Sequence, residues 1–475
     1  MAIKEAHSED LMEKIVSLCK RRGFIYQGSE IYGGLAGTWD YGPLGSELDS
    51  NIKNYWMKKF VRERDDIYKM DAAIMMHPRV WEASGHTEGF NDPLVEDKVT
   101  HKRYRADHIL EGAGVNVKNM SVGDMGKKMI ELKLKSPDGN LLTEPKVFNL
   151  LVEAGIGAVE GQKERVFLRG EITQGVHVNF KNVLDSMHPK IPFGIAQIGK
   201  AFRNEIVPGN FLFRVREFDQ MELQYYIRPE DAEGKRQYEE WKNFSMAWYE
   251  GLGIRKENLR FRQHEQDERA HYARDAWDIE YKTPFGGWKE AWGIHHRGDW
   301  DIRRHAEYSG VSMEYSDEKG QKFLPWIIET SGGAGRAFLF TLLDAYKEDE
   351  LGGEKRVFLS LAPHLAPIKV AVFPLLKNKP QLVEKAREVY SMLKKEFGAV
   401  VFDDNGNIGK RYRRQDEIGT VTAVTVDFET LDDDTVTLRD RDSGKQVRVK
   451  ISRTVEIISE IIKGKPFSEF PLEIK

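Results

Sequence analysis

The sequence has a single cysteine, no long apolar run and almost no excess of charge. Cys19, alone among 475 residues, cannot form an intrachain disulfide, and a metal site made of several cysteines is equally excluded. The longest apolar run, residues 370–376, is far shorter than the roughly 18 residues that a membrane helix needs. The first residues lack the apolar segment of a signal peptide. We therefore expect a cytoplasmic protein with no membrane partner.

The charges of the chain nearly cancel, with 72 lysines and arginines against 76 aspartates and glutamates and a formal net charge of -4. This balance argues against a protein that coats nucleic acid over its whole surface, although a local basic patch can still bind it. Apolar residues make up 40% of the chain and charged residues 31%, which is typical of a folded globular protein. The length predicts about three folded units.

Two apolar patterns near the N-terminus predict helices. Residues 9–22 repeat apolar side chains at the helical period, and Cys19 falls on this apolar face. A longer helix follows, and its apolar side contains Leu48, Ile52, Tyr55, Trp56 and Phe60. We expect this aromatic face to bury against another subunit.

The pattern changes twice along the rest of the chain. Between about residues 91 and 146 the periodicity weakens, which predicts an insertion. After residue 366, strands alternate with a helix, and the expected elements are strand 368–373, helix 380–397, strand 400–402 and strand 421–427. This alternation predicts a separate small α/β domain with a mixed or parallel sheet. The expected start of the linker is the region of residues 352–355, which opens with a glycine pair.

Residues 196–222 contain two predicted strands joined by a turn at 207–210. In the second strand, alternate positions place Arg214, Arg216, Phe218, Gln220 and Glu222 on one face. In the first strand, the matching face holds Gln197, Arg203 and Glu205. The face can be a solvated surface with cross-strand ion pairs, or a binding site. An aromatic residue among the charges, Phe218, favours a site for a flat, charged ligand.

A second candidate element is the glycine-rich turn of residues 330–336, which ends in Arg336 and joins a strand at 323–329 to a helix at 337–346. Its glycines allow a ligand to approach the backbone at the start of a helix. Alone, such a corner is usually structural. Together with the hairpin, however, it resembles the second and third signature motifs of class II aminoacyl-tRNA synthetases, in the same order.

Longer segments resemble bacterial-type glycyl-tRNA synthetases, namely residues 31–34, 38–45, 81–86, 103–107 and 409–417. The resemblance implies an α+β protein with an antiparallel catalytic sheet, a homodimer and a C-terminal α/β anticodon-binding domain. The implied boundaries are 1–90 and 150–355 for the catalytic domain, 91–149 for the insertion and 364–475 for the anticodon-binding domain.

The implied reaction is the ATP-dependent ligation of glycine to tRNA(Gly) through a glycyl-adenylate, for protein synthesis. One alternative is a catalytically silent relative that serves as an RNA-binding or polymerase-accessory subunit, although Arg203, Glu205 and Arg336 are all present. Another is a class II synthetase for histidine, threonine or proline. Those larger substrates need an open side-chain pocket, which the expected cluster of three glutamates argues against.

The resemblance also implies residues for ATP. Arg203 neutralises the α-phosphate, Phe218 and Arg336 enclose adenine, and Glu205 holds its amino group. Glu217 and Glu290 are the expected carboxylates for Mg²⁺, because that ion prefers oxygen ligands. The expected catalytic residues are Arg203, Glu217 and Arg336. The remaining expected ATP contacts are Asn204, Phe213, Arg214, Val215, Arg216, Ala291, Gly333, Ala334 and Gly335.

For glycine, the resemblance brings Glu171, Glu222 and Glu329 to the ammonium group, while Ser331 and nearby backbone exclude larger side chains. Because like charges crowd there, we predict that at least one of the three carboxyls has a raised pKa in the empty pocket. Arg105 and Arg297 are expected near the glycine carboxylate and the pocket. The remaining expected glycine contacts are Phe218, Asp219, Gln220, Met221, Thr330, Gly332 and Gly333.

The basic run that contains Lys410, Arg411, Arg413 and Arg414 is predicted to bind tRNA, because its four cations surround one tyrosine. By composition alone, a solvated helix face is an equal alternative. His295, His296 and His305 lack the spacing of a metal site, so we expect structural or pocket-lining roles for them.

Several positions differ from the family pattern. They are Gly170, Ile172, Thr173, Lys289, Ala291, Thr330 and Gly335. The loss of proline at positions 170 and 330 is expected to loosen the backbone of the unfolded chain. Some relatives carry metal-binding cysteines around residues 97–100. This chain has none, so we expect no zinc.

Overall fold

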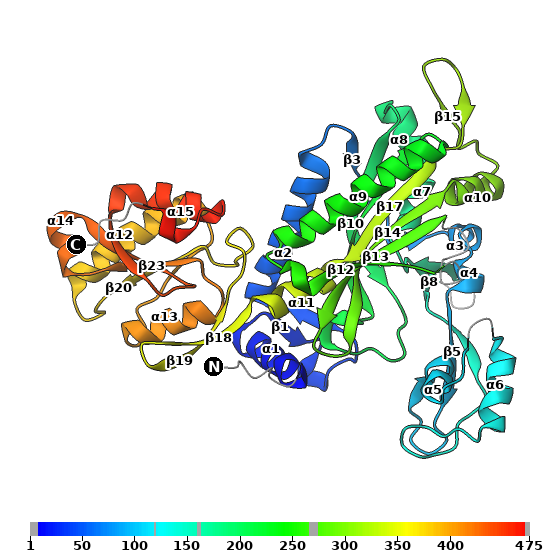
Figure 1. The fold of residues 1–475 in the computed structure, drawn as a ribbon, viewed down its shortest axis with the longest axis horizontal. Helices are drawn as coiled ribbons and strands as arrows, with labels where there is room; N and C mark the ends of the chain where they lie inside the picture. Colours follow the sequence, from blue (N-terminus) through cyan, green and yellow to red (C-terminus); the bar gives the residue numbers. More distant parts are fainter. Residues whose placement is uncertain (1–7, 118–119, 159–162, 266–273, 471–475) are drawn as a thin grey trace.

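The computed structural model describes residues 8–117, 120–158, 163–265 and 274–470 (Figure 1). Its centre is a seven-stranded sheet with the strand order β12-β13-β14-β17-β11-β10-β3. Neighbouring strands are antiparallel except β10 and β3, which run parallel. The strands are β3 (Ile67–Lys69), β10 (Phe193–Phe202), β11 (Glu217–Ile227), β12 (Leu259–Gln263), β13 (Asp275–Thr283), β14 (Gly287–Gly298) and β17 (Trp326–Gly333). The predicted antiparallel sheet is confirmed.

Helices cover one face of this sheet and form the main core. They are α1 (Ser8–Arg22), α2 (Pro43–Met57), α9 (Asp231–Gly251) and α11 (Ala334–Ala345). Cys19 is fully buried there, as the pattern of α1 predicted. Trp56 and Phe60 are also buried, and the Phe60 ring lies 6.0 Å from that of Trp241 in α9. The prediction that this aromatic face meets another subunit is therefore wrong, because α9 covers it within the chain.

The opposite face of the sheet is only partly covered. The covering helices are α7 (Thr173–Val178), α8 (Phe180–Met187) and α10 (Trp300–Ser309). Val176, Phe180 and Ile302 from these helices pack against Phe193 and Tyr226 of the sheet. The rest of this face is left for polar side chains, and it carries the candidate site.

A smaller, three-stranded sheet lies beside that face of the main sheet. It consists of β4 (Met75–Met76), β9 (Glu164–Leu168) and β8 (Val152–Ile156), in that order. Helices α3 (Pro78–Ala83) and α4 (His86–Gly89) lie beside it, and α3 starts with Pro78 at its first position. After β9 ends at Leu168, the carbonyl of Arg169 accepts from the amide of Phe202 at 2.8 Å, so the chain just before Glu171 is tied to the end of β10.

The predicted hairpin is confirmed, but both strands lie farther from the turn than expected, since β10 ends at Phe202 and β11 begins at Glu217. Phe202 of β10 pairs with Glu217 of β11, and the ladder ends there. The amide of Arg216 donates instead to the carbonyl of Gly37, at 2.8 Å, so a third segment ends the pairing. Residues 211–213 form a 3₁₀ turn, not part of a strand, and Phe211 has a positive φ of 59°.

Residues 91–149 fold as a small unit on one side of the main sheet (Figure 1). Its strands β6 (Arg103–Arg105), β5 (Asn91–Glu96) and β7 (Lys146–Asn149) form one sheet, packed by α5 (Ala106–Gly112) and α6 (Val122–Glu131). Val95, Leu110 and Met129 belong to its own apolar cluster. The segment that was predicted as an insertion is therefore an ordered unit.

A hairpin joins the main sheet to the C-terminal domain. Its strands are β18 (Tyr346–Leu351) and β19 (Glu354–Leu359), and Gly352 and Gly353 form the turn with φ of 65° and 80°. The expectation that the linker starts at this glycine pair is corrected, because the turn belongs to a paired hairpin. The buried Arg356 fixes the hairpin to the C-terminal domain by donating to the carbonyls of Arg441 and Asp442.

The C-terminal domain lies on the side of the main sheet away from the insertion (Figure 1). Its mixed sheet has the order β21-β20-β22-β23-β24, with β20 parallel to β21 and β22. The elements are β20 (Val370–Pro374), α12 (Pro380–Phe397), β21 (Val400–Phe402), α13 (Ile408–Glu417), β22 (Thr422–Val426), α14 (Phe428–Asp433), β23 (Thr435–Asp440), β24 (Gln446–Lys450) and α15 (Thr454–Ile462). The predicted α/β domain is confirmed. Among the described residues, no helix has both the length and the apolar composition of a membrane span.

Candidate active site

The strand register brings polar side chains from three strands into rows on the uncovered face. In one row Glu222 of β11 pairs with Ser331 of β17, and Ser331 pairs with Gly293 of β14. In the next row Gln224 pairs with Glu329, and Glu329 pairs with His295. Because side chains two residues apart share a face, both rows point to the same side of the sheet. The site is therefore built from strands that are far apart in the sequence.

These rows form the floor of a cavity of about 290 Å³. The predicted site residues that line it are Glu171, Arg203, Glu205, Phe213, Arg214, Val215, Phe218, Gln220, Glu222, Glu290, Arg297, Glu329, Ser331, Gly332, Gly333, Gly335 and Arg336. Four further residues line it that were not predicted as ligand contacts, namely Thr173, Leu212, Gly293 and His295. The cavity thus combines the predicted adenine and glycine residues in one place.

Nine predicted site residues do not line the cavity. Four are buried away from it, namely Met221, Thr330, Ala334 and Ala291. Met221 and Thr330 alternate with lining residues along their strands, so their side chains point into the helix-covered core. For these residues only the backbone remains available to a ligand.

The other five lie at the rim or in the insertion. Arg216 donates to the carbonyls of Glu205 and Ala36. Glu217 lies 3.3 Å from Lys200 Nζ, and Asp219 lies 2.7 Å from Lys53 Nζ. Asn204 continues the backbone beyond β10, with its amide bonded to the carbonyl of Leu150.

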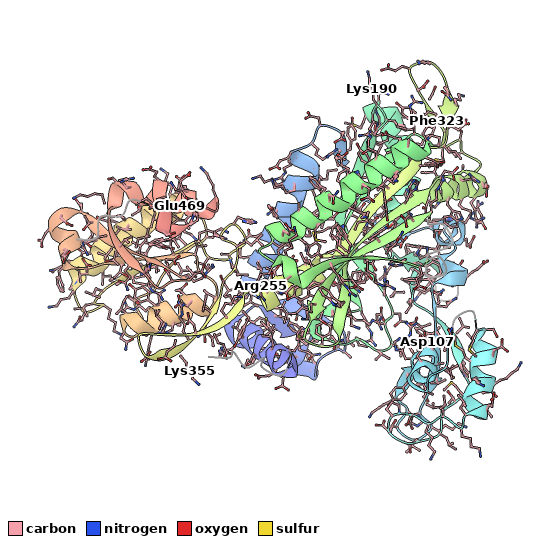
Figure 2. All side chains as sticks on the ribbon, in the orientation of Figure 1. Asp107, Lys190, Arg255, Phe323, Lys355 and Glu469 are labelled. Carbon is pink, nitrogen blue, oxygen red and sulfur yellow. The ribbon has the colours of Figure 1, made fainter. Side chains whose placement is uncertain are left out.

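Arg105 is held by two carboxylates of the insertion. Its Nη1 lies 2.7 Å from Asp92 Oδ1, and its Nη2 lies 2.7 Å from Asp107 Oδ2. Figure 2 labels Asp107 in the insertion, apart from the main sheet. The structure thus does not bring Arg105 to the three glutamates, since its guanidinium is already paired.

Two of the three cavity glutamates have basic side chains as partners. Glu329 accepts from Arg297 Nη1 at 2.9 Å, and its other oxygen lies 2.8 Å from His295 Nδ1. Glu171 lies 3.3 Å from His86 Nε2 and accepts from Gln174 at 3.0 Å. These partners fix both carboxylates in position.

Glu222 has only neutral partners among its hydrogen bonds in the described chain. Gln224 Nε2 donates to Glu222 Oε1 at 2.8 Å and also to Glu329 Oε2 at 2.7 Å. Ser331 Oγ lies 2.9 Å from the second oxygen of Glu222. The shared amide of Gln224 thus holds two carboxylates close together, and only one of them has a cation beside it.

The pKa values follow these partners. Burial, followed by the charges of Glu329 and Glu171, raises the pKa of Glu222 to about 8. Burial also opposes ionisation of Glu171 and Glu329, but their pKa values lie below the ordinary value. His86 is the main opposing partner for Glu171, and Arg297 for Glu329. The prediction of one raised pKa is confirmed, although burial contributes more than the crowding of like charges.

The other end of the cavity carries two guanidinium groups against aromatic rings. Arg203 lies 5.3 Å from the centre of the Phe218 ring and donates from Nε to the carbonyl of Gly170 at 3.0 Å. Arg336 lies 4.5 Å from the centre of the Phe213 ring, and its Nη1 is 3.1 Å from Glu290 Oε1. Such planar cations and rings suit a flat base with anionic phosphates.

The three histidines that were considered together do not form a metal site. His295 faces the cavity, whereas His296 packs on the other side of β14 against Trp326, with ring centres 5.3 Å apart. His305 lies 2.8 Å from the side-chain oxygen of Gln174. Within the described ranges, no group of three or more histidine, cysteine, aspartate or glutamate side chains is arranged for a metal ion.

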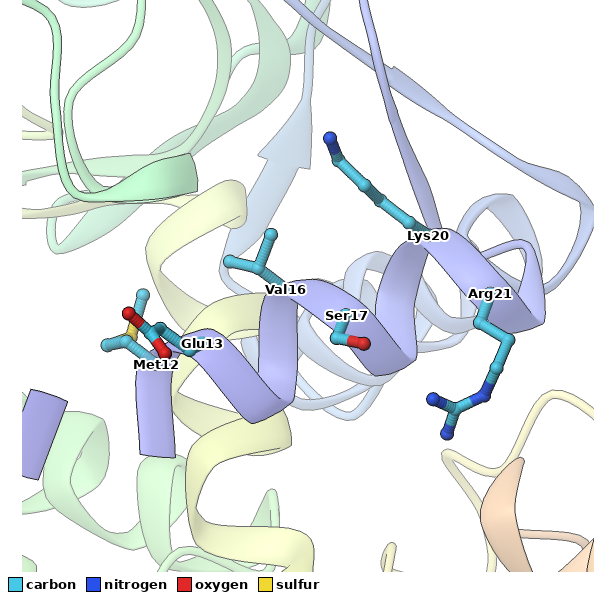
Figure 3. A pocket seen from close by; sticks show the side chains of 6 residues that line it. All are labelled: Met12, Glu13, Val16, Ser17, Lys20 and Arg21. Atoms are coloured by element: carbon cyan, nitrogen blue, oxygen red, sulfur yellow. The ribbon is translucent and has the colours of Figure 1, made fainter. Parts of the chain in front are cut away.

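A larger hollow, of about 780 Å³, lies over helix α1 (Figure 3). It is lined by Met12, Glu13, Val16, Ser17, Lys20 and Arg21. The side chains of Lys20 and Arg21 point away from each other, and Glu13 is the one carboxylate (Figure 3). Because its polar groups do not converge, this hollow is a weaker candidate than the smaller cavity.

Comparison with known proteins assigns both domains. Residues 158–346 match the tRNA synthetase class II core domain (G, H, P, S and T), and residues 369–461 match an anticodon binding domain. The glycine–tRNA ligase of Caldanaerobacter subterraneus subsp. tengcongensis is 48% identical over 95% of this chain and 98% of its own length. That of Acetivibrio thermocellus is 50% identical over 93% of this chain and 96% of its own length. The chain belongs to the glycine–tRNA ligase family.

Two of the positions that the sequence analysis expects to differ from the family pattern are tightly packed. A Cβ atom on Gly170 would lie 3.0 Å from Leu151 Cδ2 and 3.1 Å from Phe90 Cε1. Thr330 is fully buried, and its hydroxyl has no hydrogen-bond partner in the described part of the chain. Neighbouring side chains thus enclose both positions in the folded protein, and the expected effect of the missing prolines on the unfolded chain stays a prediction.

The anticodon-binding domain of this glycine–tRNA ligase family member contains the predicted basic run, on α13. Arg411 is only 1% exposed and donates to the carbonyls of Pro374, Asp404 and Gly406. Arg414 pairs with Asp403, and Arg413 donates to the carbonyl of Leu351 at 3.1 Å. The structure thus places Arg411 inside the domain, unlike the prediction of a side chain that faces RNA. Contacts of tRNA with Lys410, Arg413 and Arg414 stay predictions.

Proposed function

We propose that this protein ligates glycine to tRNA(Gly) in two steps, first joining glycine to ATP as glycyl-adenylate and then passing the glycyl group to the tRNA. One observation carries the proposal. Glu171, Glu222 and Glu329 come from three separate segments of the chain and line the same cavity as Arg203 and Arg336. Family membership indicates glycine as the substrate. The cavity residues support a position for its ammonium group, its carboxylate and the ATP that activates it.

The three carboxylates suit the ammonium group of glycine. A primary ammonium has three N–H donors, and charge-assisted hydrogen bonds to carboxylates are among the stronger ones. Glu171 and Glu329 are already ionised, and Glu222 loses its proton when the ammonium binds. Ser331 and Gly293 keep the floor of the pocket shallow, so selection depends on the small size of glycine as well as on its charge.

In the first step the carboxylate of glycine attacks the α-phosphate of ATP, and pyrophosphate leaves as the bond between the α-phosphorus and the bridging oxygen breaks. The substrate supplies its own nucleophile, so the protein mainly positions the two groups and stabilises the charge that develops on phosphorus. Arg203 is the proposed cation at the α-phosphate, because its guanidinium is fixed between the carbonyl of Gly170 and the Phe218 ring. Arg297 fixes Glu329 and is itself held by Asp301 at 2.7 Å, so its proposed role is to position that glutamate.

The adenine ring is proposed to lie between Phe218 and Arg336, with Glu205 near its amino group. Magnesium binds phosphate oxygens and water and needs only one or two protein carboxylates. Glu290 is the proposed main carboxylate for the ion because it lines the cavity. Glu217, which lies at the rim beside Lys200, is proposed as the second. When bound, the ion would neutralise phosphate charge.

Further parts of the proposal concern the whole molecule. The domain at 364–475 contacts the anticodon of tRNA, the catalytic domain spans 1–90 and 150–355, and the insertion spans 91–149. The protein acts in the cytoplasm as a homodimer. The match of residues 369–461 to an anticodon-binding family supports the first of these.

The test is amino-acid-dependent exchange of pyrophosphate into ATP with the purified protein, run with each of the twenty amino acids. The expected result is exchange with glycine alone, followed by charging of tRNA(Gly). Exchange with another amino acid would contradict the substrate. Exchange with none would favour a silent relative.

A further inference from the structure

The His295 side chain forms a wall of the cavity that the proposed recognition of glycine does not use. The imidazole follows Gly293 on the same face of β14 and leans back over it. A Cβ atom on Gly293 would lie 2.8 Å from His295 Cε1 and 3.2 Å from Nε2. The ring thus occupies space that any side chain at residue 293 would need.

Two neighbours keep the ring in that place. Its Nδ1 lies 2.8 Å from Glu329 Oε1. On the other side, the His264 ring lies 6.3 Å away at 84°, and His264 itself is 2.7 Å from Asp278 Oδ2. The side chain of His295 is still 24% exposed, so it reaches the cavity surface and is not a core residue.

The strand register places the His295 ring beside the residues with the smallest side chains in the cavity floor. Gly293 pairs with Ser331, and Ser331 pairs with Glu222, the carboxylate that lacks a cationic partner among its hydrogen bonds. An amino acid whose ammonium lies at Glu222 therefore has its α-carbon close to Ser331, and a substituent on that carbon that extends toward β14 meets the imidazole.

We infer that His295 is a specificity residue, whose ring excludes amino acids with a side chain from the glycine pocket while its Nδ1 holds Glu329. The inference rests on the proposed function. It adds a side chain from β14 to the residues of β11 and β17 that select glycine over larger amino acids. Gly293, two residues earlier on the same face, lacks the Cβ atom that the ring would otherwise meet.

The test compares exchange with glycine and with alanine in the wild-type protein and in H295A and H295N. Asparagine places an amide nitrogen near the position of Nδ1, so H295N separates the volume of the ring from its hydrogen bond to Glu329. Since one methyl group changes discrimination by roughly 10- to 200-fold, both variants should lower the glycine-to-alanine ratio of kcat/KM by about tenfold or more. H295N should keep a KM for glycine closer to that of the wild type than H295A does.

Two controls complete the design. H296N removes the next histidine, which packs against Tyr238 and Trp326 on the other face, and should leave the ratio unchanged. G293A adds the crowding methyl group and should raise the KM for glycine without admitting alanine. Melting temperatures check that each variant is folded.

An unchanged glycine-to-alanine ratio in both His295 variants, with glycine still activated, would overturn the inference and leave the proposed function intact. A wild-type protein that does not activate glycine would overturn both. The two failures are therefore distinguishable in one set of assays.

Discussion

The carboxylates of the cavity and the cations of helix α13 are both dense groups of charge, yet the structure leaves them in opposite situations. On α13, Arg411 is buried against three carbonyls, and Arg414 pairs with Asp403. In the cavity, Glu222 is buried with only neutral hydrogen-bond donors and acquires a pKa of about 8. A charged group that its own chain satisfies stabilises the fold, whereas one that lacks an opposite charge is ready for a ligand.

The largest expected effect is on Glu222. In E222Q the side chain keeps the shape of the protonated carboxyl but cannot ionise, so the ammonium of glycine loses a charged partner. Truncating one partner of a buried charge pair costs about 2–5 kcal/mol, which is roughly 30- to 4000-fold in kcat/KM for glycine. Exchange kinetics would measure it, with the KM for ATP as the internal control. A loss of less than about threefold would show that Glu222 does not meet the substrate.

A substitution of the buried cation on α13 should lower the stability of the C-terminal domain. R411M removes the donor to three carbonyl oxygens in the C-terminal domain, which costs on the order of 3 kcal/mol because buried acceptors lose their partners. Thermal unfolding of the full-length protein would show a lower melting temperature for that domain. Glycine-dependent exchange, which needs no tRNA, should be retained below that temperature. An unchanged melting curve together with weak tRNA binding would instead favour a direct RNA contact.

The raised pKa of Glu222 predicts a proton balance for binding. At pH 7 the free protein holds this proton, and the ammonium of glycine expels it, so binding should release about one proton per glycine. Calorimetry in two buffers with different ionisation enthalpies would measure the release. No release would mean that Glu222 is already ionised or remains neutral in the complex.

The raised pKa of Glu222 also makes the free energy of unfolding depend on pH. The folded pKa of about 8 lies above the ordinary value of 4.5, so the folded state binds a proton that the unfolded chain loses. Stability therefore decreases as the pH rises from about 4.5 to about 8, and the loss is complete above that range. The stability of E222Q relative to the wild type should rise across the same interval.

The smallest expected effect is at Lys410, which continues the basic run at the surface of α13. K410A should leave folding and glycine-dependent exchange unchanged. If Lys410 contacts a phosphate, the slope of log KM for tRNA against log salt should fall by about one. An unchanged slope would assign Lys410 to the solvated face of the helix.

The regular elements of the chain were readable from local patterns. The α12 helix and the β21 strand have the predicted bounds, and the alternation around Glu222 predicted its face correctly, because helix and strand periods are properties of adjacent residues. The family resemblance supplied the site residues that periodicity could not connect, such as Glu171 with Glu329.

Other features depended on contacts between distant segments. His295 and Gly293 enter the cavity through the pairing of β14 with β17, and no period in either strand shows that pairing. The strand expected at residues 211–216 is lost because Arg216 bonds to Gly37. The burial of Arg411 was also unpredictable, since a basic helix does not show which of its cations face its own domain.

The most direct test of the account is a crystal structure with a stable analogue of glycyl-adenylate. The ammonium of the analogue should lie within about 3 Å of Glu222 and of at least one of Glu171 and Glu329, with Arg203 against the phosphate position. An ammonium group that faces solvent, or a glycyl group outside the cavity, would contradict it.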